Sequence, residues 1–165
     1  MTSGDDWLRS IEAAESFLDS LAPSEPGYWM QQYLKIRTKT EGLKSWRFNR
    51  IQRILYQEVR KAWTESRPIR FLVPKSRQMG ISTFVQGLIF ERTFRIPNLS
   101  SAVIAHDEDG ALNIFQMART FYEELPEDMK LVRQVRYSGV KQLEFEAPHR
   151  SKYHVETIKS GDRLG

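Results

Sequence analysis

Apolar residues along the chain recur with helical spacing in several segments, each with one apolar stripe and charged residues elsewhere. These segments predict amphipathic helices over residues 5–21, 49–62, 82–95 and 107–125. Two short apolar runs, residues 69–73 and 101–105, precede the last two helices and predict buried strands. Two strand–loop–helix units in succession predict a parallel sheet that is covered by helices.

From Leu131 onward the apolar positions alternate with a period of two, which is typical of half-buried antiparallel strands. The alternating segments are residues 131–137, 142–147 and 153–159. Residues 35–48 are also expected to be extended, around a turn at Glu41-Gly42. Upstream, a cluster of helix-breaking residues at Ala22–Gly27 separates the first helix from the rest of the chain.

We therefore predict an N-terminal amphipathic helix with its linker over residues 1–27, and one domain over residues 28–165. The predicted fold class is α/β, with a mostly parallel sheet flanked by helices. Antiparallel strands are added towards the C-terminus, and the first helix is an appendage to this domain.

The composition is that of a globular protein, with 40% hydrophobic and 28% charged residues among 165. The chain has no cysteine, which excludes disulfides and thiolate metal sites and suits a reducing cytosol. Apolar runs are shorter than a membrane span, and the acidic start of the chain does not resemble a signal peptide. We expect an intracellular protein. The histidines His106, His149 and His154 are not spaced as metal ligands or as part of a catalytic triad.

The net charge of +4 is unevenly placed, because 13 basic residues between positions 35 and 77 are opposed by three glutamates. Such a block suits a polyanion and predicts contact with DNA. The alternative is a solvated surface whose charges form local pairs. The basic residues are Lys35, Arg37, Lys39, Lys44, Arg47, Arg50, Arg53, Arg60, Lys61, Arg67, Arg70, Lys75 and Arg77.

The stretch Ile69–Thr83 passes from an apolar run through a polar loop into a helical pattern, as expected for strand, phosphate loop and helix. Aligned with the pattern G-x-x-x-x-G-K-[ST], Gly80 takes the second glycine and Ser82 the hydroxyl that binds Mg²⁺. An isoleucine stands at the lysine of the pattern, and Lys75 stands at the first glycine. The flexible side chain of Lys75 can reach the β- and γ-phosphates from the other side of the loop, with Arg77 as a second, forked donor.

The loop Lys75–Thr83 (KSRQMGIST) resembles the variant Walker A motif of the large terminase subunits of tailed bacteriophages, in which the lysine opens the loop. That family is the ATPase that drives viral DNA into empty capsids. The resemblance implies a P-loop NTPase-like fold, with ATP and Mg²⁺ as cofactors. It implies that Lys75 and Arg77 bind the phosphates and stabilise developing charge, and that Ser82 binds Mg²⁺ with Thr83 as a backup hydroxyl. The residues that it places around the nucleotide are Gln52, Lys75, Ser76, Arg77, Gln78, Met79, Gly80, Ile81, Ser82 and Thr83.

Gln52 has two candidate roles. Asn49–Gln52 has the spacing of a capping box, in which the glutamine side chain bonds back to the backbone at the start of a helix. A glutamine shortly before the phosphate loop and near an aromatic residue also resembles the adenine-recognising glutamine of terminases and helicases. There the side-chain amide pairs with a donor and an acceptor of the base. The two roles compete for the same amide.

Phosphoryl transfer also requires acidic residues, normally supplied by an apolar strand that ends in Asp-Glu. The nearest candidates are Asp107 and Glu108, where His106 interrupts the pattern and a helix is expected to begin. We expect these acids to cap that helix. In terminases the acidic strand, Walker B, follows a glycine-containing segment that Ser160–Gly165 resembles. The resemblance therefore covers residues 28–165. It implies part of the ATPase domain, without Walker B and without the nuclease domain. We expect weak ATP binding and little hydrolysis.

The resemblance implies several partners: viral double-stranded DNA, the portal protein of the procapsid, a small terminase subunit and sister copies in a ring. It implies a location in the host cell cytoplasm, transiently at the procapsid portal. Two alternatives remain open: a helicase-like ATPase, which shares the order of glutamine and loop, and a basic DNA-binding or scaffold domain without nucleotide. Ile81 in place of lysine favours the scaffold.

Overall fold

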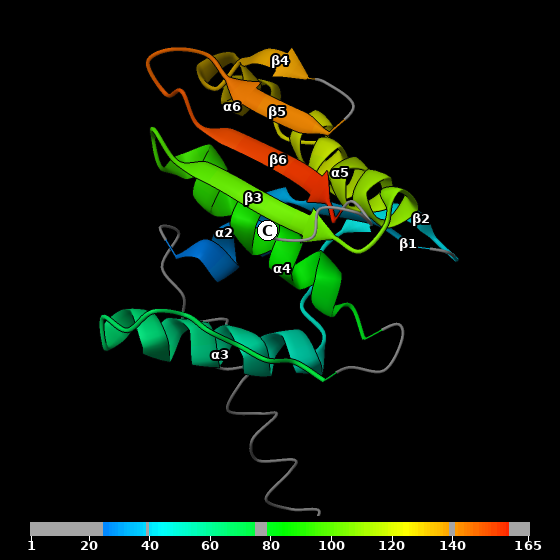
Figure 1. The fold of residues 1–165 in the computed structure, drawn as a ribbon, viewed down its shortest axis with the longest axis vertical. Helices are drawn as coiled ribbons and strands as arrows, with labels where there is room; N and C mark the ends of the chain where they lie inside the picture. Colours follow the sequence, from blue (N-terminus) through cyan, green and yellow to red (C-terminus); the bar gives the residue numbers. More distant parts are fainter. Residues whose placement is uncertain (1–24, 39, 75–78, 139–140, 159–165) are drawn as a thin grey trace, which may run out of the picture.

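The computed structural model describes residues 25–38, 40–74, 79–138 and 141–158 (Figure 1). The helices are α2 (Pro26–Tyr33), α3 (Arg50–Thr64), α4 (Ile81–Arg95), α5 (Glu108–Glu123) and α6 (Glu127–Val132). The strands are β1 (Lys35–Thr38), β2 (Gly42–Ser45), β3 (Ser100–Ala105), β4 (Val135–Ser138), β5 (Gln142–Phe145) and β6 (Lys152–Thr157). The predicted N-terminal helix and the segment Ser160–Gly165 lie outside the described residues. Pro26 and Gly27, expected in the linker, begin α2.

The larger sheet is mixed and has the strand order β3-β6-β5-β4. β3 and β6 are parallel, with Ser100 opposite Lys152 and Ala105 opposite Thr157. β5 pairs antiparallel with β6 and with β4, as the period of two predicts. The α/β class and the antiparallel addition are therefore confirmed, whereas a mostly parallel sheet is wrong for the described strands. β1 and β2 form a separate antiparallel hairpin around the expected turn.

The apolar run at residues 69–73, predicted as a buried strand, has no regular structure. Most of its side chains are exposed, with Leu72 at 97% and Phe71 at 46%, and Val73 is partly buried. In the view of Figure 1 this segment is drawn across α3, and neither sheet lies next to it in the picture. A strand is stabilised by hydrogen bonds to a neighbouring strand, and within the described residues this segment pairs with none. The apolar residues indicate that this segment has the propensity to form a strand, but they do not indicate whether a neighbouring strand is present to pair with it.

Leu131 and Val132, predicted to start a strand, lie in the short helix α6 and are 70% and 69% exposed. β4 begins three residues later, at Val135. Glu127 and Asp128 lie in the first turn of α6, where negative charge favours a helix, and this local preference prevails over the alternating pattern.

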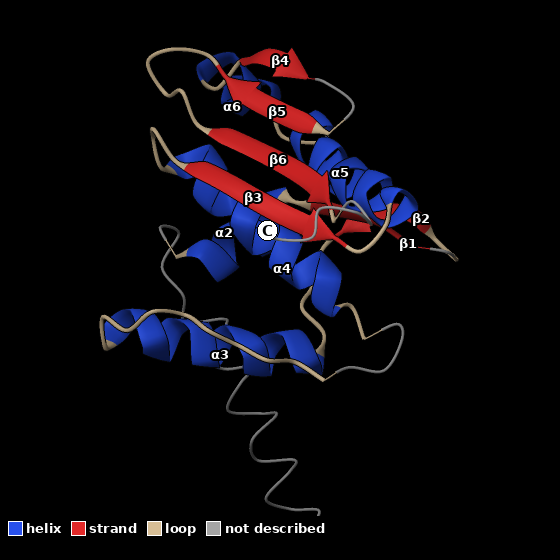
Figure 2. Cartoon of the chain, in the orientation of Figure 1, coloured by secondary structure: helices blue, strands red, loops and turns tan. Residues whose placement is uncertain are grey.

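Helices α4 and α5 pack against one face of the larger sheet (Figure 2). Alternate strand residues face these helices, and the side chains of Leu143, Tyr153 and Val155 are fully or almost fully buried. On β3 the alternation leaves Ile104 66% exposed. Among the described elements, helices α4 and α5 cover one face of this sheet, which explains why the period of two is visible in the sequence.

The core is rich in aromatic rings. Trp46 is fully buried, stacked parallel to Phe121 at 5.9 Å and edge-on to Phe48 at 5.3 Å. It also lies against Gly87 in α4, where a Cβ atom would be 2.3 Å from the indole ring. Only glycine allows the helix backbone to approach the ring this closely. The packing of Trp46 fixes α4 relative to the segment that precedes α3.

Candidate functional site

The candidate site is the junction at which the predicted phosphate loop enters α4. Gly80 is the N-cap of α4 and has left-handed dihedral angles, φ 70° and ψ 13°. Gly80 has no side chain and therefore cannot cap the helix, and backbone N–H groups at a helix N-terminus are suited to bind an anion. A left-handed residue followed by a helical one also points successive N–H groups to one side, the geometry of an anion-binding nest.

Five of the predicted loop residues are described: Met79, Gly80, Ile81, Ser82 and Thr83. Lys75, Ser76, Arg77 and Gln78 lie outside the described residues, so their predicted roles remain predictions.

The side chain of Ile81 is 5% exposed and belongs to the core. A lysine at this position would bury a charge, which gives a physical reason for the departure from the standard motif. Ser82 and Thr83 are partly exposed at the first turn of α4.

Gln52 forms the predicted capping box with Asn49. The Asn49 side chain accepts a hydrogen bond from the Gln52 backbone N–H at 3.0 Å, and Gln52 Oε1 accepts from the Asn49 N–H at 3.0 Å. The capping role of Gln52 is therefore confirmed. Its amide also contacts Trp46 and Gly80, and its side chain is 3% exposed. Adenine recognition by Gln52 stays a prediction, and a base would have to replace bonds that the amide makes here.

The acids after β3 cap a helix, as expected. Asp107 is the N-cap of α5, and its Oδ1 accepts a hydrogen bond from the Gly110 N–H at 2.6 Å. Glu108 forms an ion pair with Lys141 at 2.7 Å. In the part of the chain that the structure describes, no group of three His, Asp or Glu residues is arranged to hold a metal ion.

The basic block is partly neutralised within the molecule. Lys35 pairs with Glu124 at 3.1 Å, and Arg60 pairs with Glu25 at 3.4 Å. Two further pairs join Lys44 to Glu41 and Arg67 to Glu65, each at 2.5 Å. These contacts favour the alternative of a solvated surface with local pairs over one continuous polyanion site. The exposed basic side chains that keep the DNA hypothesis open include Arg37, Arg47, Lys61 and Arg70.

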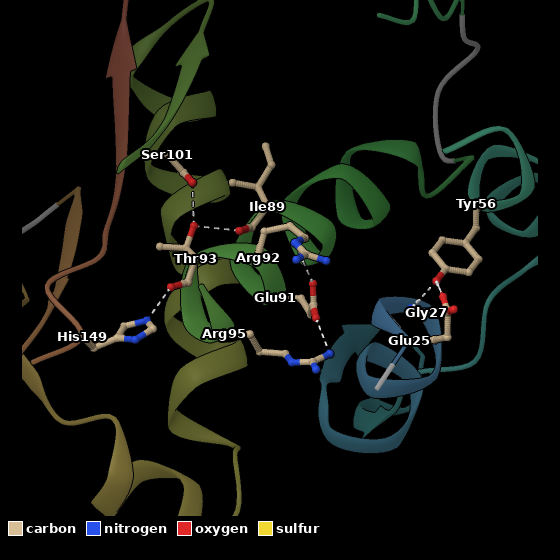
Figure 3. Close-up of polar contacts among 10 residues, drawn as sticks. All are labelled: Glu25, Gly27, Tyr56, Ile89, Glu91, Arg92, Thr93, Arg95, Ser101 and His149. Atoms are coloured by element: carbon tan, nitrogen blue, oxygen red, sulfur yellow. Dashed lines mark hydrogen bonds and ion pairs between the residues drawn. The ribbon is translucent and has the colours of Figure 1, made fainter. Parts of the chain in front are cut away.

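Sequence analysis did not single out Glu91, a fully buried acid on α4 (Figure 3). Its Oε1 accepts a hydrogen bond from Arg95 at 2.9 Å, while its Oε2 is 3.8 Å from Nε of Arg92. Oε2 is buried without a hydrogen bond among the described groups. Burial raises the pKa of the Glu91 carboxyl, and the two arginines oppose this shift. The signal available in the sequence was a single acid within an apolar helical stretch.

A second polar cluster surrounds Thr93, which is also buried (Figure 3). Its hydroxyl lies 2.7 Å from that of Ser101, and its carbonyl oxygen lies 2.9 Å from His149 Nε2. His149 thereby joins α4 to the loop before β6. The bond to Thr93 gives His149 a structural role.

No protein-family model matches the chain, and no curated protein matches it. Within the described ranges, every helix is too short or too polar to cross a lipid bilayer.

Proposed function

We propose that this chain is the ATP-binding portion of a viral DNA-packaging motor of the large terminase type, with a P-loop NTPase-like fold. The observation that carries the proposal is the left-handed Gly80 at the start of α4, directly after a loop of the terminase type. The N-terminus of α4, where Gly80 offers no side-chain cap, suits the phosphates of a nucleotide, because the positive end of the helix dipole favours an anion. We propose an ATPase, and we expect the isolated chain to hydrolyse little ATP.

The proposed roles follow the resemblance. Lys75 and Arg77 hold the β- and γ-phosphates and stabilise developing charge, while Gly80 lets the backbone approach the nucleotide. Ser82 is the candidate ligand for Mg²⁺, and Gln52 is the candidate for reading adenine. A single hydroxyl is a weak site by itself, since Mg²⁺ in such proteins is bound by carboxylates and substrate phosphates together. When bound with the nucleotide, the cation neutralises charge on the phosphate oxygens.

Calorimetric titration with ATP and Mg²⁺ tests the proposal, with Lys75→Ala as the comparison. We expect weak binding by the parent chain and a clear loss in Lys75→Ala, because the variant removes a cation that contacts the outer phosphates. Absence of binding by the parent chain would refute the proposal. A steady-state assay completes the test, since robust ATP turnover by the 165-residue chain contradicts the expected lack of catalytic acids.

The proposed partners rest on the resemblance: double-stranded viral DNA, the portal protein, a small terminase subunit and sister copies in a ring. The proposed location is the host cell cytoplasm and the procapsid portal. Binding of duplex DNA at increasing salt tests the first partner, since phosphate contacts weaken steeply as salt rises. Affinity that does not change with salt argues against contact through the basic block.

The second candidate is a basic DNA-binding or scaffold domain that does not use nucleotide. The replacement of the standard lysine by Ile81 favours it, because an isoleucine side chain carries no charge for the phosphates. This candidate predicts no nucleotide binding in either the parent chain or Lys75→Ala, together with salt-dependent binding of DNA.

A further inference from the structure

The turn that opens α4 is held by two side-chain amides from the start of α3. Asn49 Nδ2 donates a hydrogen bond to the carbonyl oxygen of Met79 at 3.1 Å. Gln52 Nε2 donates to the carbonyl oxygen of Gly80 at 2.7 Å. We call Asn49 and Gln52 the amide clamp. The clamp joins two segments that lie about thirty residues apart in the sequence.

Trp46 fixes the orientation of the Gln52 amide. The indole Nε1–H of Trp46 and the backbone N–H of Asn49 both donate to one terminal atom of Gln52, at 3.2 Å and 3.0 Å. An atom that accepts from two donors must be the oxygen, so the NH₂ group faces Gly80. Because Trp46 is fully buried, the core holds this orientation.

The clamp acts on the direction of two backbone N–H groups. At Gly80 it acts together with α4 itself, because the Gly80 carbonyl oxygen also accepts a hydrogen bond from the Phe84 N–H at 3.0 Å. In a trans peptide the C=O and the N–H point to opposite sides. The clamp draws the carbonyl oxygens of Met79 and Gly80 towards α3, so the N–H groups of Gly80 and Ile81 point away from α3. These N–H groups belong to the turn that opens α4, where the helix dipole favours an anion.

We propose that Asn49 and Gln52 are positioning residues for an anion at the turn Met79–Ile81, and that Trp46 positions Gln52. This inference rests on the proposed function, because the direction of these N–H groups affects binding only where an anion is bound. The clamp acts on the phosphate end of the ligand. Loss of the Asn49 amide therefore weakens the binding of every triphosphate to the same extent, whatever base the triphosphate carries.

Asn49→Ser separates the clamp from the cap. Serine is as good an N-cap as asparagine, so α3 keeps its cap, but serine lacks the amide that reaches Met79. Asn49→Ala loses both the helix cap and the hydrogen bond to Met79. Gln57→Ala is the control, because it removes an amide of the same helix that is not part of the clamp. Calorimetry measures the affinity of each variant for ATP, GTP and inorganic tripolyphosphate, and a melting curve measures its stability.

We expect Asn49→Ser to melt close to the parent chain and to bind all three ligands about fivefold more weakly, the effect of one net hydrogen bond. Gln57→Ala should bind like the parent chain. Parent-like affinity of Asn49→Ser for all three ligands overturns the proposal. A loss confined to ATP overturns it too, since that result indicates contact with the base.

If the parent chain binds none of the three ligands, the proposed function fails and the clamp is judged separately. The ¹⁵N heteronuclear NOE of Gly80 and Ile81 reports fast backbone motion in the ligand-free chain. Lower values in Asn49→Ser than in the parent chain support a clamp that orders this turn. Unchanged values overturn the clamp as well.

Discussion

The packing of Gly87 against Trp46 allows a direct test of the aromatic core. In Gly87→Ala the new methyl carbon would lie 2.3 Å from Cζ3 and 2.6 Å from Cη2 of the indole ring. Carbon atoms in contact prefer about 3.5–4.0 Å, so the ring or the helix must shift by more than 1 Å. The ring cannot shift freely, because it is fully buried, stacks on Phe121 and donates a hydrogen bond to Gln52.

Overpacking a core costs about 1–3 kcal/mol, and the tight contact places Gly87→Ala near the upper end. Alanine in a helix interior returns about 1 kcal/mol relative to glycine. The expected net loss is therefore about 2 kcal/mol, which lowers the melting temperature of a chain of this size by about 4–8 °C. Differential scanning calorimetry measures this shift.

Two control variants sharpen the test of Gly87→Ala. Val85→Ala lies on the same helix at a side chain that is 39% exposed, and its effect should be within about 0.5 kcal/mol. Trp46→Phe removes the ring atoms that the new methyl group meets. The double variant should therefore lose less stability than the sum of the single losses. A melting temperature of Gly87→Ala at or above that of the parent chain refutes the packing argument.

Further predictions concern buried charge, capping and an unpaired segment. Because burial raises the pKa of Glu91, the parent chain should lose stability as pH rises from about 4.3, the unfolded value, through the folded pKa, and Glu91→Gln should lack this loss. If the parent chain and Glu91→Gln differ in melting temperature by the same amount at every pH from 4 to 7, the expected effect of Glu91 is contradicted. Asp107→Ala should cost about 1 kcal/mol by removing the cap of α5, while Asp107→Asn should cost little; equal losses in chemical denaturation argue against capping. Leu72→Ser should change stability by less than about 0.5 kcal/mol, since Leu72 is 97% exposed, and a loss above about 2 kcal/mol indicates a buried strand.

The sequence predicted best those features that depend on neighbouring residues. The helices α3, α4 and α5 begin within two residues of their expected positions, because caps and apolar stripes are local signals. The capping box at Asn49 and the cap at Asp107 were read from spacing alone. The hairpin of β1 and β2 followed from a glycine turn, and Gly42 has the positive φ that such a turn requires.

The sequence could not show which bonds the candidate site makes between distant segments. Gln52 and Gly80 are 28 positions apart, and neither the spacing nor the composition indicates that their side chain and carbonyl meet. The burial of Glu91 was equally hidden: its partners Arg92 and Arg95 lie on the same helix, but its complete burial follows only from the packing of α4. Long-range hydrogen bonds are fixed by tertiary structure, so a single sequence contains no direct signal for them.

Gly80 and Ile81 carry the strongest sequence signal for a phosphate loop. They also show which features follow from residue type and which from tertiary packing. Gly80 was identified by its type, and the structure gives it a left-handed conformation, which glycine adopts without strain. Ile81 was counted against nucleotide binding, yet its burial shows that packing alone is sufficient reason for an apolar residue there. Its side chain points into the core while its backbone N–H belongs to the turn. A phosphate loop binds its ligand through the direction of its backbone N–H groups as much as through side-chain charge. In the proposed site, the missing lysine therefore affects the affinity for phosphate more than the shape of the loop.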